Sequence, residues 1–125
     1  MLAVTRFDVP AAEAAAFLEQ ASVVLDLLAG KPGFRSGRLT RAADAPGVWA
    51  LVTEWDSVGA YRRSLSADVR MVATPLLALS RDEESAFEVL RAVDAGGTRT
   101  AGSSRAADAD VVGLGQAAGP AASDL

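Results

Sequence analysis

The sequence predicts an α+β fold in which helices cover one face of a four-stranded antiparallel sheet. Segments rich in β-branched and aromatic residues are separated by segments whose apolar residues recur every three or four positions. The segments follow the order strand, helix, strand, strand, short helix, helix, strand, with a hairpin between the two middle strands. A chain of 125 residues can bury roughly two thirds of its surface, which is enough for one core without disulfides.

The first strand and the first helix lie on either side of Pro10. Residues 2–9 are apolar and β-branched without glycine, which indicates a strand, and Pro10 ends it and suits a first helical turn. The helix that follows has an apolar stripe and ends at Gly30, after which residues 31–33 turn the chain. The stripe consists of Ala14, Phe17, Leu18, Ala21, Val24, Leu25 and Leu28.

The two middle strands are predicted at residues 34–41 and 48–55, with a turn at residues 44–47. The first of them carries three arginines, among them Arg38, which indicates a side that faces solvent or a ligand. The second has the strongest strand pattern in the sequence, because β-branched and aromatic residues fill most of it. Its two-residue periodicity predicts a face made of Trp49, Leu51, Thr53 and Trp55.

Two helices and a closing strand complete the predicted domain. Ser57 is expected to cap a short helix over residues 58–65, and a second helix is expected over residues 67–79. Pro75 falls inside the second helix and is expected to kink or interrupt it, because proline lacks an amide donor and clashes with the preceding turn. Residues 86–93 are predicted to form the closing strand.

The composition divides the chain into two regions. Residues 1–94 are predicted to form the folded domain, and residues 95–125 a disordered tail. The tail is dominated by Gly, Ala, Ser and Asp, and it has no aromatic residue and no sustained apolar periodicity. The alternative is that a segment around Val111, Val112 and Leu114 folds onto a partner.

The composition also excludes several classes of function. The formal net charge of −4 argues against nucleic acid as a partner, because phosphate binding needs clustered Lys and Arg. The sequence has neither His nor Cys, which excludes thiol nucleophiles, imidazole bases and the zinc or haem sites that need these residues. The acidic residues 82–84 are expected to form a solvated turn rather than a metal site. We therefore expect no metal and no cofactor.

Targeting segments are not evident in the sequence. No stretch combines a basic leader with an unbroken apolar run, and none approaches the roughly 20 apolar residues of a membrane helix. A soluble cytoplasmic protein without a membrane partner is therefore expected.

The predicted layers have a consequence for assembly. Helices on one face of a sheet leave the other face open to water, and here that face is expected to carry apolar residues. A second copy of the same sheet is the simplest cover, so the layers predict a homodimer.

Three short segments carry a resemblance to a known family. Residues 32–34 (Pro-Gly-Phe), residues 54–57 (Glu-Trp-Asp-Ser) and residues 60–61 (Ala-Tyr) resemble the antibiotic biosynthesis monooxygenase family. The resemblance covers about residues 1–93 and implies a ferredoxin-like protomer within a dimeric α+β barrel. The family includes cofactor-independent oxygenases of anthrone-type polyketide intermediates, which use molecular oxygen, and haem-degrading enzymes.

The haem-degrading branch of the family is not matched at its functional positions. By resemblance that branch uses an Asn, a Trp and a His, where this sequence has Thr5, Ser64 and a position near Thr74. Since the sequence contains no His or Asn, the usual axial ligand is missing and haem degradation is not expected.

The anthrone-oxygenase branch is matched at two of four positions. Trp55 and Tyr61 are similar to the Trp and Tyr of that branch. Leu51 replaces its Asn, and Pro75 falls near its helix Arg, for which Arg70 is the nearest substitute. Leu51 removes a hydrogen-bond donor that could hold a substrate carbonyl or enolate.

These residues define a hypothesis for the site: a cofactor-independent monooxygenase of an aromatic or polyketide-like molecule. Trp55 would be a stacking wall or a donor, and Tyr61 a hydrogen-bond partner or proton carrier, although both are also typical core residues. Arg38 and Arg70 could stabilise an oxyanion. The alternatives are a non-catalytic ligand-binding or dimerisation module and a polyketide cyclase or isomerase. The expected substrate-binding residues are Thr5, Phe7, Arg38, Leu51, Arg70 and Met71.

Overall fold

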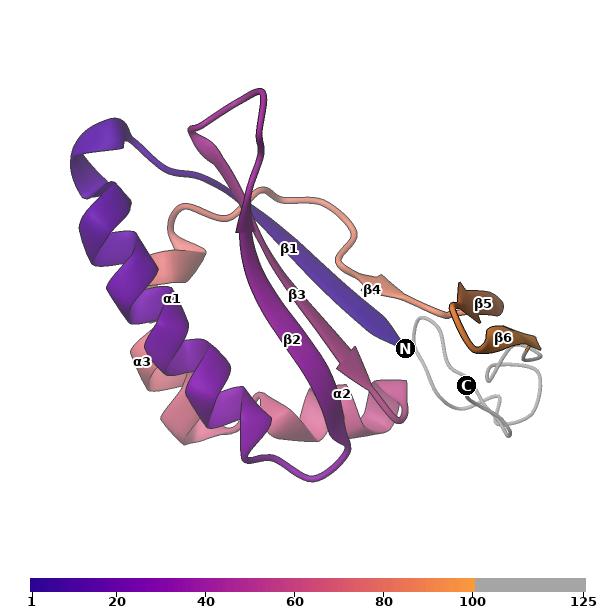
Figure 1. The fold of residues 1–125 in the computed structure, drawn as a ribbon. Coiled ribbons are helices and arrows are strands. Elements are labelled where there is room, and N and C mark those ends of the chain that lie inside the picture. The colour runs from indigo at the N-terminus through magenta and orange to yellow at the C-terminus, as the bar shows by residue number, and fades with distance from the viewer. Residues whose placement is uncertain (101–125) are drawn as a thin grey trace.

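The computed structural model of the protein describes residues 1–100, which contain a four-stranded antiparallel sheet with helices packed on one face (Figure 1). The predicted α+β class is confirmed. The outer strand β2 pairs with β3 in the hairpin that the sequence predicts, and β1 lies between β3 and β4. In spatial order the strands are β2 (Phe34–Arg41), β3 (Val48–Trp55), β1 (Leu2–Asp8) and β4 (Ala86–Phe87).

Three helices and a short 3-10 turn form the second layer. In Figure 1 the helices α1 and α3 run along the same side of the sheet, and α2 lies at its end. The Ser57 hydroxyl accepts a hydrogen bond from the amide of Ala60 at 3.0 Å, which confirms it as the cap of the short helix. The elements are η1 (Ala11–Glu13), α1 (Ala14–Ala29), α2 (Val58–Ser64) and α3 (Ala67–Leu77).

The helix α3 continues through Pro75, so the predicted interruption at this residue is wrong. Proline lacks the amide that would donate to the carbonyl four residues earlier, at Met71, but only Leu76 and Leu77 follow it in the helix, so the missing bond affects the last turn alone. The helix ends two residues later, at Leu77, rather than at Leu79.

The closing strand is much shorter than predicted. Only Ala86–Phe87 pairs with β1, because the amides and carbonyls along the rest of that edge already bond to the preceding segment. The amide of Val4 donates to Ser85 at 2.7 Å, and the amide of Asp8 donates to Leu79 at 3.0 Å. The prediction of one strand over residues 86–93 is therefore wrong.

The residues after β4 form a separate two-stranded hairpin. β5 (Arg91–Asp94) pairs with β6 (Gly97–Thr100), and the Asp94 carboxylate accepts a hydrogen bond from the Gly96 amide in the turn. Gly97 has a φ of 137°, which glycine adopts without a steric penalty. β6 lies in the segment that the sequence assigns to the tail, and the remainder of that tail, including residues 111–114, lies outside the described residues.

The core lies between the sheet and the helices and is rich in aromatic contacts. The rings of Phe7 and Phe17 lie 5.0 Å apart, and that of Phe17 lies 5.2 Å from Trp49. At the other end Trp55, which has no solvent-exposed surface, packs against Phe34 at 5.3 Å. The face predicted for β3 is confirmed: Trp49, Thr53 and Trp55 are buried and Leu51 packs against the core.

The turn before β2 places α2 against the sheet. Gly33 has a φ of 90°, and a Cβ at this position would lie 2.5 Å from the Ala60 Cβ of α2. The Gly33 carbonyl accepts a hydrogen bond from the Asp56 amide at 2.8 Å. Only glycine therefore allows this close approach, which fixes the start of α2 beside the end of β3.

Within residues 1–100, no helix combines the length and the apolar character that crossing a membrane requires.

The two tryptophans differ in the state of their indole N–H groups, and this difference predicts unequal effects of substitution. Trp55 Nε1 donates to Thr53 Oγ1 at 2.8 Å, whereas Trp49 Nε1 is buried without a partner among the described residues. We expect Trp55→Phe to lower the free energy of unfolding by about 1–3 kcal/mol more than Trp49→Phe. Urea denaturation followed by circular dichroism measures both values, and equal costs would contradict the assignment.

Candidate functional site

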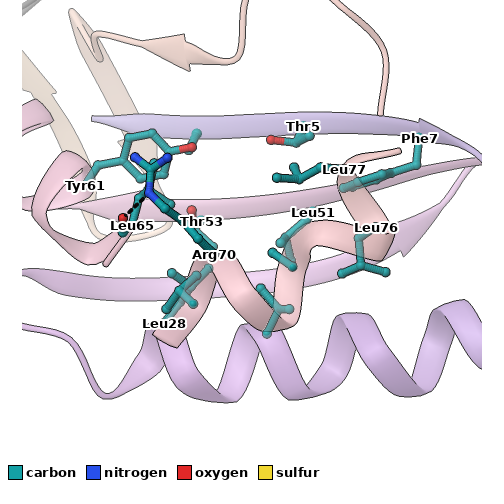
Figure 2. Close-up of a pocket in the computed structure, with 14 residues that line it drawn as sticks. Thr5, Phe7, Leu28, Leu51, Thr53, Tyr61, Leu65, Arg70, Leu76 and Leu77 are labelled. Carbon is teal, nitrogen blue, oxygen red and sulfur yellow. Dashed lines mark hydrogen bonds between the residues drawn. The ribbon is translucent and has the colours of Figure 1, made fainter. Parts of the chain in front are cut away.

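A pocket of about 150 Å³ lies between the sheet and the helices α1, α2 and α3 (Figure 2). Most of its surface is apolar, and the few polar groups come from two threonines, one tyrosine and one arginine. The lining residues are Ala3, Thr5, Phe7, Val24, Leu28, Leu51, Thr53, Tyr61, Leu65, Val69, Arg70, Ala73, Leu76 and Leu77.

The strands β1 and β3 supply the floor of the pocket. Alternation along β1 directs Thr5 and Phe7 toward the helices, and alternation along β3 does the same for Leu51 and Thr53. Thr5 and Leu51 are directly paired across the two strands, so their side chains lie next to each other on the same face. The floor therefore combines hydroxyl and apolar groups in one small area.

The helices give the pocket two unlike ends (Figure 2). Tyr61 from α2 and Arg70 from the first part of α3 lie at one end, and the Thr5 hydroxyl points toward this end. Leu76 and Leu77 from the last turn of α3 lie at the other end, beside Phe7. A ligand in this pocket would be held by hydroxyl and guanidinium groups at the first end and by apolar contacts at the second.

Tyr61 is the titratable group most affected by the pocket. Its ring packs against that of Trp55, with the centroids 5.9 Å apart. Burial raises the pKa of Tyr61 above its ordinary value of 10.0, because desolvation disfavours the phenolate. Its hydroxyl makes no hydrogen bond to the residues that the structure describes, so in the protonated form it can donate to a ligand.

Arg70 is held in place by the backbone of the preceding helix. Its Nε donates to the carbonyl oxygen of Leu65 at 2.6 Å, and Leu65 is the residue directly after α2. This bond uses one of the five N–H donors of the guanidinium and leaves the others for the pocket or for water. Figure 2 shows this bond as a dashed line, with the guanidinium at the Tyr61 end of the pocket.

Trp55 supports the pocket without lining it. Its indole N–H donates to Thr53 Oγ1 at 2.8 Å, so this donor is not available to a ligand. Since Thr53 accepts this bond, its own hydroxyl proton is left to point elsewhere, and Thr53 lines the pocket. Trp55 thus lies behind Thr53 and Tyr61, a position different from the expected stacking wall.

The structure brings together five of the eight predicted site residues, and three lie elsewhere. Tyr61, Thr5, Phe7, Leu51 and Arg70 line the pocket.

Arg38, Met71 and Trp55 do not line the pocket. Trp55 packs directly behind it, whereas Arg38 and Met71 point away from it. Arg38 is paired with Val52, which alternates with Leu51 and Thr53, so Arg38 lies on the opposite face of the sheet. Met71 is 77% exposed, because it follows Arg70 on α3 and is rotated away from the pocket.

Thr53 and the apolar wall of α3 are site residues that the sequence did not predict. Thr53 was the one hydroxyl residue in a face otherwise made of Trp49, Leu51 and Trp55, and this contrast is the signal that could have identified it. The α3 residues belong to an ordinary apolar stripe. The pattern of such a stripe is the same whether its residues border a cavity or fill a core. The wall consists of Val69, Ala73, Leu76 and Leu77.

The acidic residues lie outside the pocket. In residues 1–100 no group of three or more acidic side chains is arranged to hold a metal ion. Glu83, from the acidic run, pairs with Arg6 at 3.4 Å and is partly exposed, as expected for a turn facing solvent. The pocket can therefore offer hydrogen bonds and one positive charge, but no carboxylate among its lining residues.

The sequence was compared with models of known protein families. The family model for antibiotic biosynthesis monooxygenase matches residues 1–70, which is more than half of the chain. The chain therefore belongs to the antibiotic biosynthesis monooxygenase family. No curated protein matches the sequence.

Solved structures with similar folds include SnoaB, a cofactor-independent oxygenase from Streptomyces nogalater. The two chains are 30% identical with a TM-score of 0.59, over 71% of this chain and 94% of SnoaB. An antibiotic biosynthesis monooxygenase from Nitrosomonas europaea has a TM-score of 0.62 at 13% identity, over 71% of this chain and 88% of that one. A conserved protein from Methanosarcina mazei Go1 has a TM-score of 0.58 at 16% identity, over 68% and 84%.

The environment of Tyr61 can be tested by titration, because it is the only tyrosine in the sequence. Absorbance near 295 nm should show a single phenol whose pKa lies above 10.0 in the folded protein and falls to the ordinary value in urea. Since the folded pKa is raised, the contribution of Tyr61 to the free energy of unfolding should be constant below pH 10 and decrease as the pH rises through the folded pKa. Tyr61→Phe is the control, and a folded pKa at or below 10.0 would contradict burial.

Proposed function

We propose that the protein is a cofactor-independent monooxygenase that oxidises a small aromatic or polyketide-like molecule with molecular oxygen. The observation that supports this proposal most is the apolar pocket with Tyr61 and Arg70 at one end. Membership of the family and the 30% identity to SnoaB, itself a cofactor-independent oxygenase, agree with it.

The proposed reaction needs an electron-rich substrate that reduces oxygen directly. Loss of a proton from a phenol or anthrone gives an anion whose negative charge is shared between oxygen and a ring carbon. That carbon transfers electrons to O₂ and forms a C–O bond, which gives a peroxide. The peroxide takes up a proton and loses water, leaving a carbonyl. In total a CH₂ group and O₂ give a C=O group and H₂O, so carbon is oxidised and both oxygen atoms are reduced.

The polar residues of the pocket would offer the substrate a positive charge and a hydrogen-bond donor. Arg70 would stabilise the oxyanion, because a fixed cation near a developing negative charge lowers the energy of the transition state. Tyr61, whose pKa is raised, stays protonated at neutral pH and would donate a hydrogen bond to the same oxygen rather than act as a base. No carboxylate lines the pocket, so the substrate proton would leave to water. We therefore propose that the rate rises with pH as the substrate ionises.

Thr53 would replace a donor that Leu51 has removed. By resemblance to the anthrone oxygenases, an Asn occupies the position of Leu51, and leucine cannot hydrogen-bond to a substrate. Thr53 lies two residues further along the same face of β3 and lines the same pocket. Its hydroxyl, which accepts from Trp55, can donate to a substrate oxygen. This arrangement favours an active enzyme over a module that has lost its chemistry.

We propose further that the protein acts as a homodimer whose partners join through the open face of the sheet. On this face Leu2 and Val4 from β1 lie beside Val52 from β3 and Phe87 from β4, since paired residues share a face. Phe87 is 45% exposed in the single chain. These residues form an apolar strip on a face that also carries Glu54 beside Leu2 and Arg38 beside Val52, and a second copy would bury this strip.

Oxygen consumption tests the proposed activity. Purified protein without flavin or metal should consume O₂ with a panel of phenols, hydroquinones and anthrones faster than the protein-free mixtures do. Arg70→Gln and Tyr61→Phe should each lower kcat/KM by about 10- to 100-fold, because each removes one group that stabilises the oxyanion. Arg62→Gln, an exposed arginine of α2, is the matched control and should leave the rate unchanged.

The outcome also separates the alternatives. Binding of these compounds without O₂ consumption above background would refute the oxygenase and support a binding module. Conversion of a substrate at the same rate without oxygen would instead support a cyclase or isomerase.

The dimer has its own test. Light scattering at micromolar concentration should give a mass twice that of the chain, and Val52→Lys should give a monomer, because it places a charge in the middle of the open face. Val23→Lys, on an exposed position of α1, should remain dimeric. A wild-type monomer would contradict the proposed interface.

A further inference from the structure

The volume of the pocket is a second constraint on the ligand, beside the chemistry of its lining residues. A cavity of about 150 Å³ matches the size of an engineered apolar cavity that holds one benzene molecule. A fused three-ring skeleton has more than twice as many ring carbons as benzene and would need a correspondingly larger space. The observed volume is thus suited to a single ring.

The walls of the pocket oppose expansion, because most of them also belong to the core. Phe7, Val69 and Leu76 are almost completely buried, and Phe7 also packs against Phe17. Protein interiors are close-packed, so moving such side chains costs contacts on their far sides. Leu77 is the exception among the α3 leucines, since it is 53% exposed and lies at the edge of the pocket.

The polar groups are also placed for a single oxygen-bearing ring. Thr53, the Tyr61 hydroxyl and the guanidinium of Arg70 lie at one end, Phe7 lies at the other, and Thr5 lies between them, near Leu77, with its hydroxyl pointing toward the polar end (Figure 2). One phenolic oxygen at the polar end would place the opposite ring carbon among apolar side chains. Dioxygen is apolar and enters such surroundings more readily than water does.

We propose that the substrate is a single-ring phenol with hydrogen on the carbon opposite the hydroxyl, rather than a fused-ring anthrone. This inference rests on the proposed function and names its substrate class. The phenol loses its O–H proton, and the opposite carbon loses hydrogen and gains an oxygen from O₂. The products are a para-quinone and one water, so that C₆H₆O and O₂ give C₆H₄O₂ and H₂O. The four electrons that leave the ring reduce O₂.

Anaerobic titration calorimetry with 2-methylphenol, 1-naphthol and anthrone tests the size limit separately from catalysis. We expect 2-methylphenol to bind at least about tenfold more tightly than 1-naphthol, and anthrone not to bind. Leu77→Ala, which opens the edge of the pocket without removing a buried side chain, should raise the affinity for 1-naphthol about tenfold. Leu18→Ala, an equivalent change at a half-exposed leucine of α1 outside the pocket, is the matched control.

A filling substitution tests the same limit from the opposite direction. Ala73→Leu adds three carbons to the wall and should abolish binding of 2-methylphenol, while circular dichroism confirms that the fold is retained. Binding of anthrone to the wild type as tightly as 2-methylphenol would overturn the size limit and leave the proposed oxygenase standing. Binding of none of the three compounds would overturn both. An affinity for 1-naphthol that is the same in Leu77→Ala as in the wild type would refute the assigned pocket.

Discussion

The two-residue alternation of β3 is the constraint on which the rest of the structure depends. It sends Trp49, Leu51, Thr53 and Trp55 toward the helices and leaves Val52 on the open face. A shift of register by one residue would exchange the two sets and expose two tryptophans to water. The pairing of β3 with both β1 and β2 prevents this shift, and the Gly33 turn fixes where the strand ends. The core, the pocket floor and the open face are all consequences of this one register.

The site is assembled in layers behind the residues that would meet a ligand. Trp55 does not reach the pocket, yet its indole N–H holds Thr53 and its ring supports Tyr61. Leu65, at the end of α2, contributes its carbonyl oxygen to hold Arg70 on α3. Buried groups therefore hold Thr53 and Tyr61 before a ligand arrives, whereas Arg70 is exposed and is held by one bond to the backbone. Preorganised donors of this kind are more effective in stabilising charge than mobile ones.

The fold could be predicted from the sequence because its signals are local. Apolar spacing in α1, β-branched residues in β3 and the Ser57 cap each specify an element without reference to the rest of the chain. The closing strand was predicted wrongly because residues 79–85 already bond to much of the free edge of β1. The length of the closing strand therefore depends on how much of that edge is left. Such competition for partners between distant segments is not visible in a local pattern.

The site was predicted less completely for a related reason. The resemblance to the anthrone oxygenases pointed to Tyr61, Leu51 and Arg70, and all three line the pocket. The side of the sheet that each residue faces could not be inferred where the strand pattern was weak, as in β2, and Arg38 lies on the face opposite the pocket. Whether a helix stripe fills a core or borders a cavity depends on the volume between layers, which no single segment encodes.

One surface of the helix α3 both stabilises the domain and borders the pocket that would select the ligand. Its fully buried wall residues, Val69 and Leu76, hold the layers together, so changing them to reshape the cavity would weaken the domain. Leu77, at the exposed edge, does not have this double role. Natural variation that adapts this fold to new compounds should therefore accumulate at the exposed edge of the pocket, and Val69 and Leu76 should vary little even among relatives with different substrates.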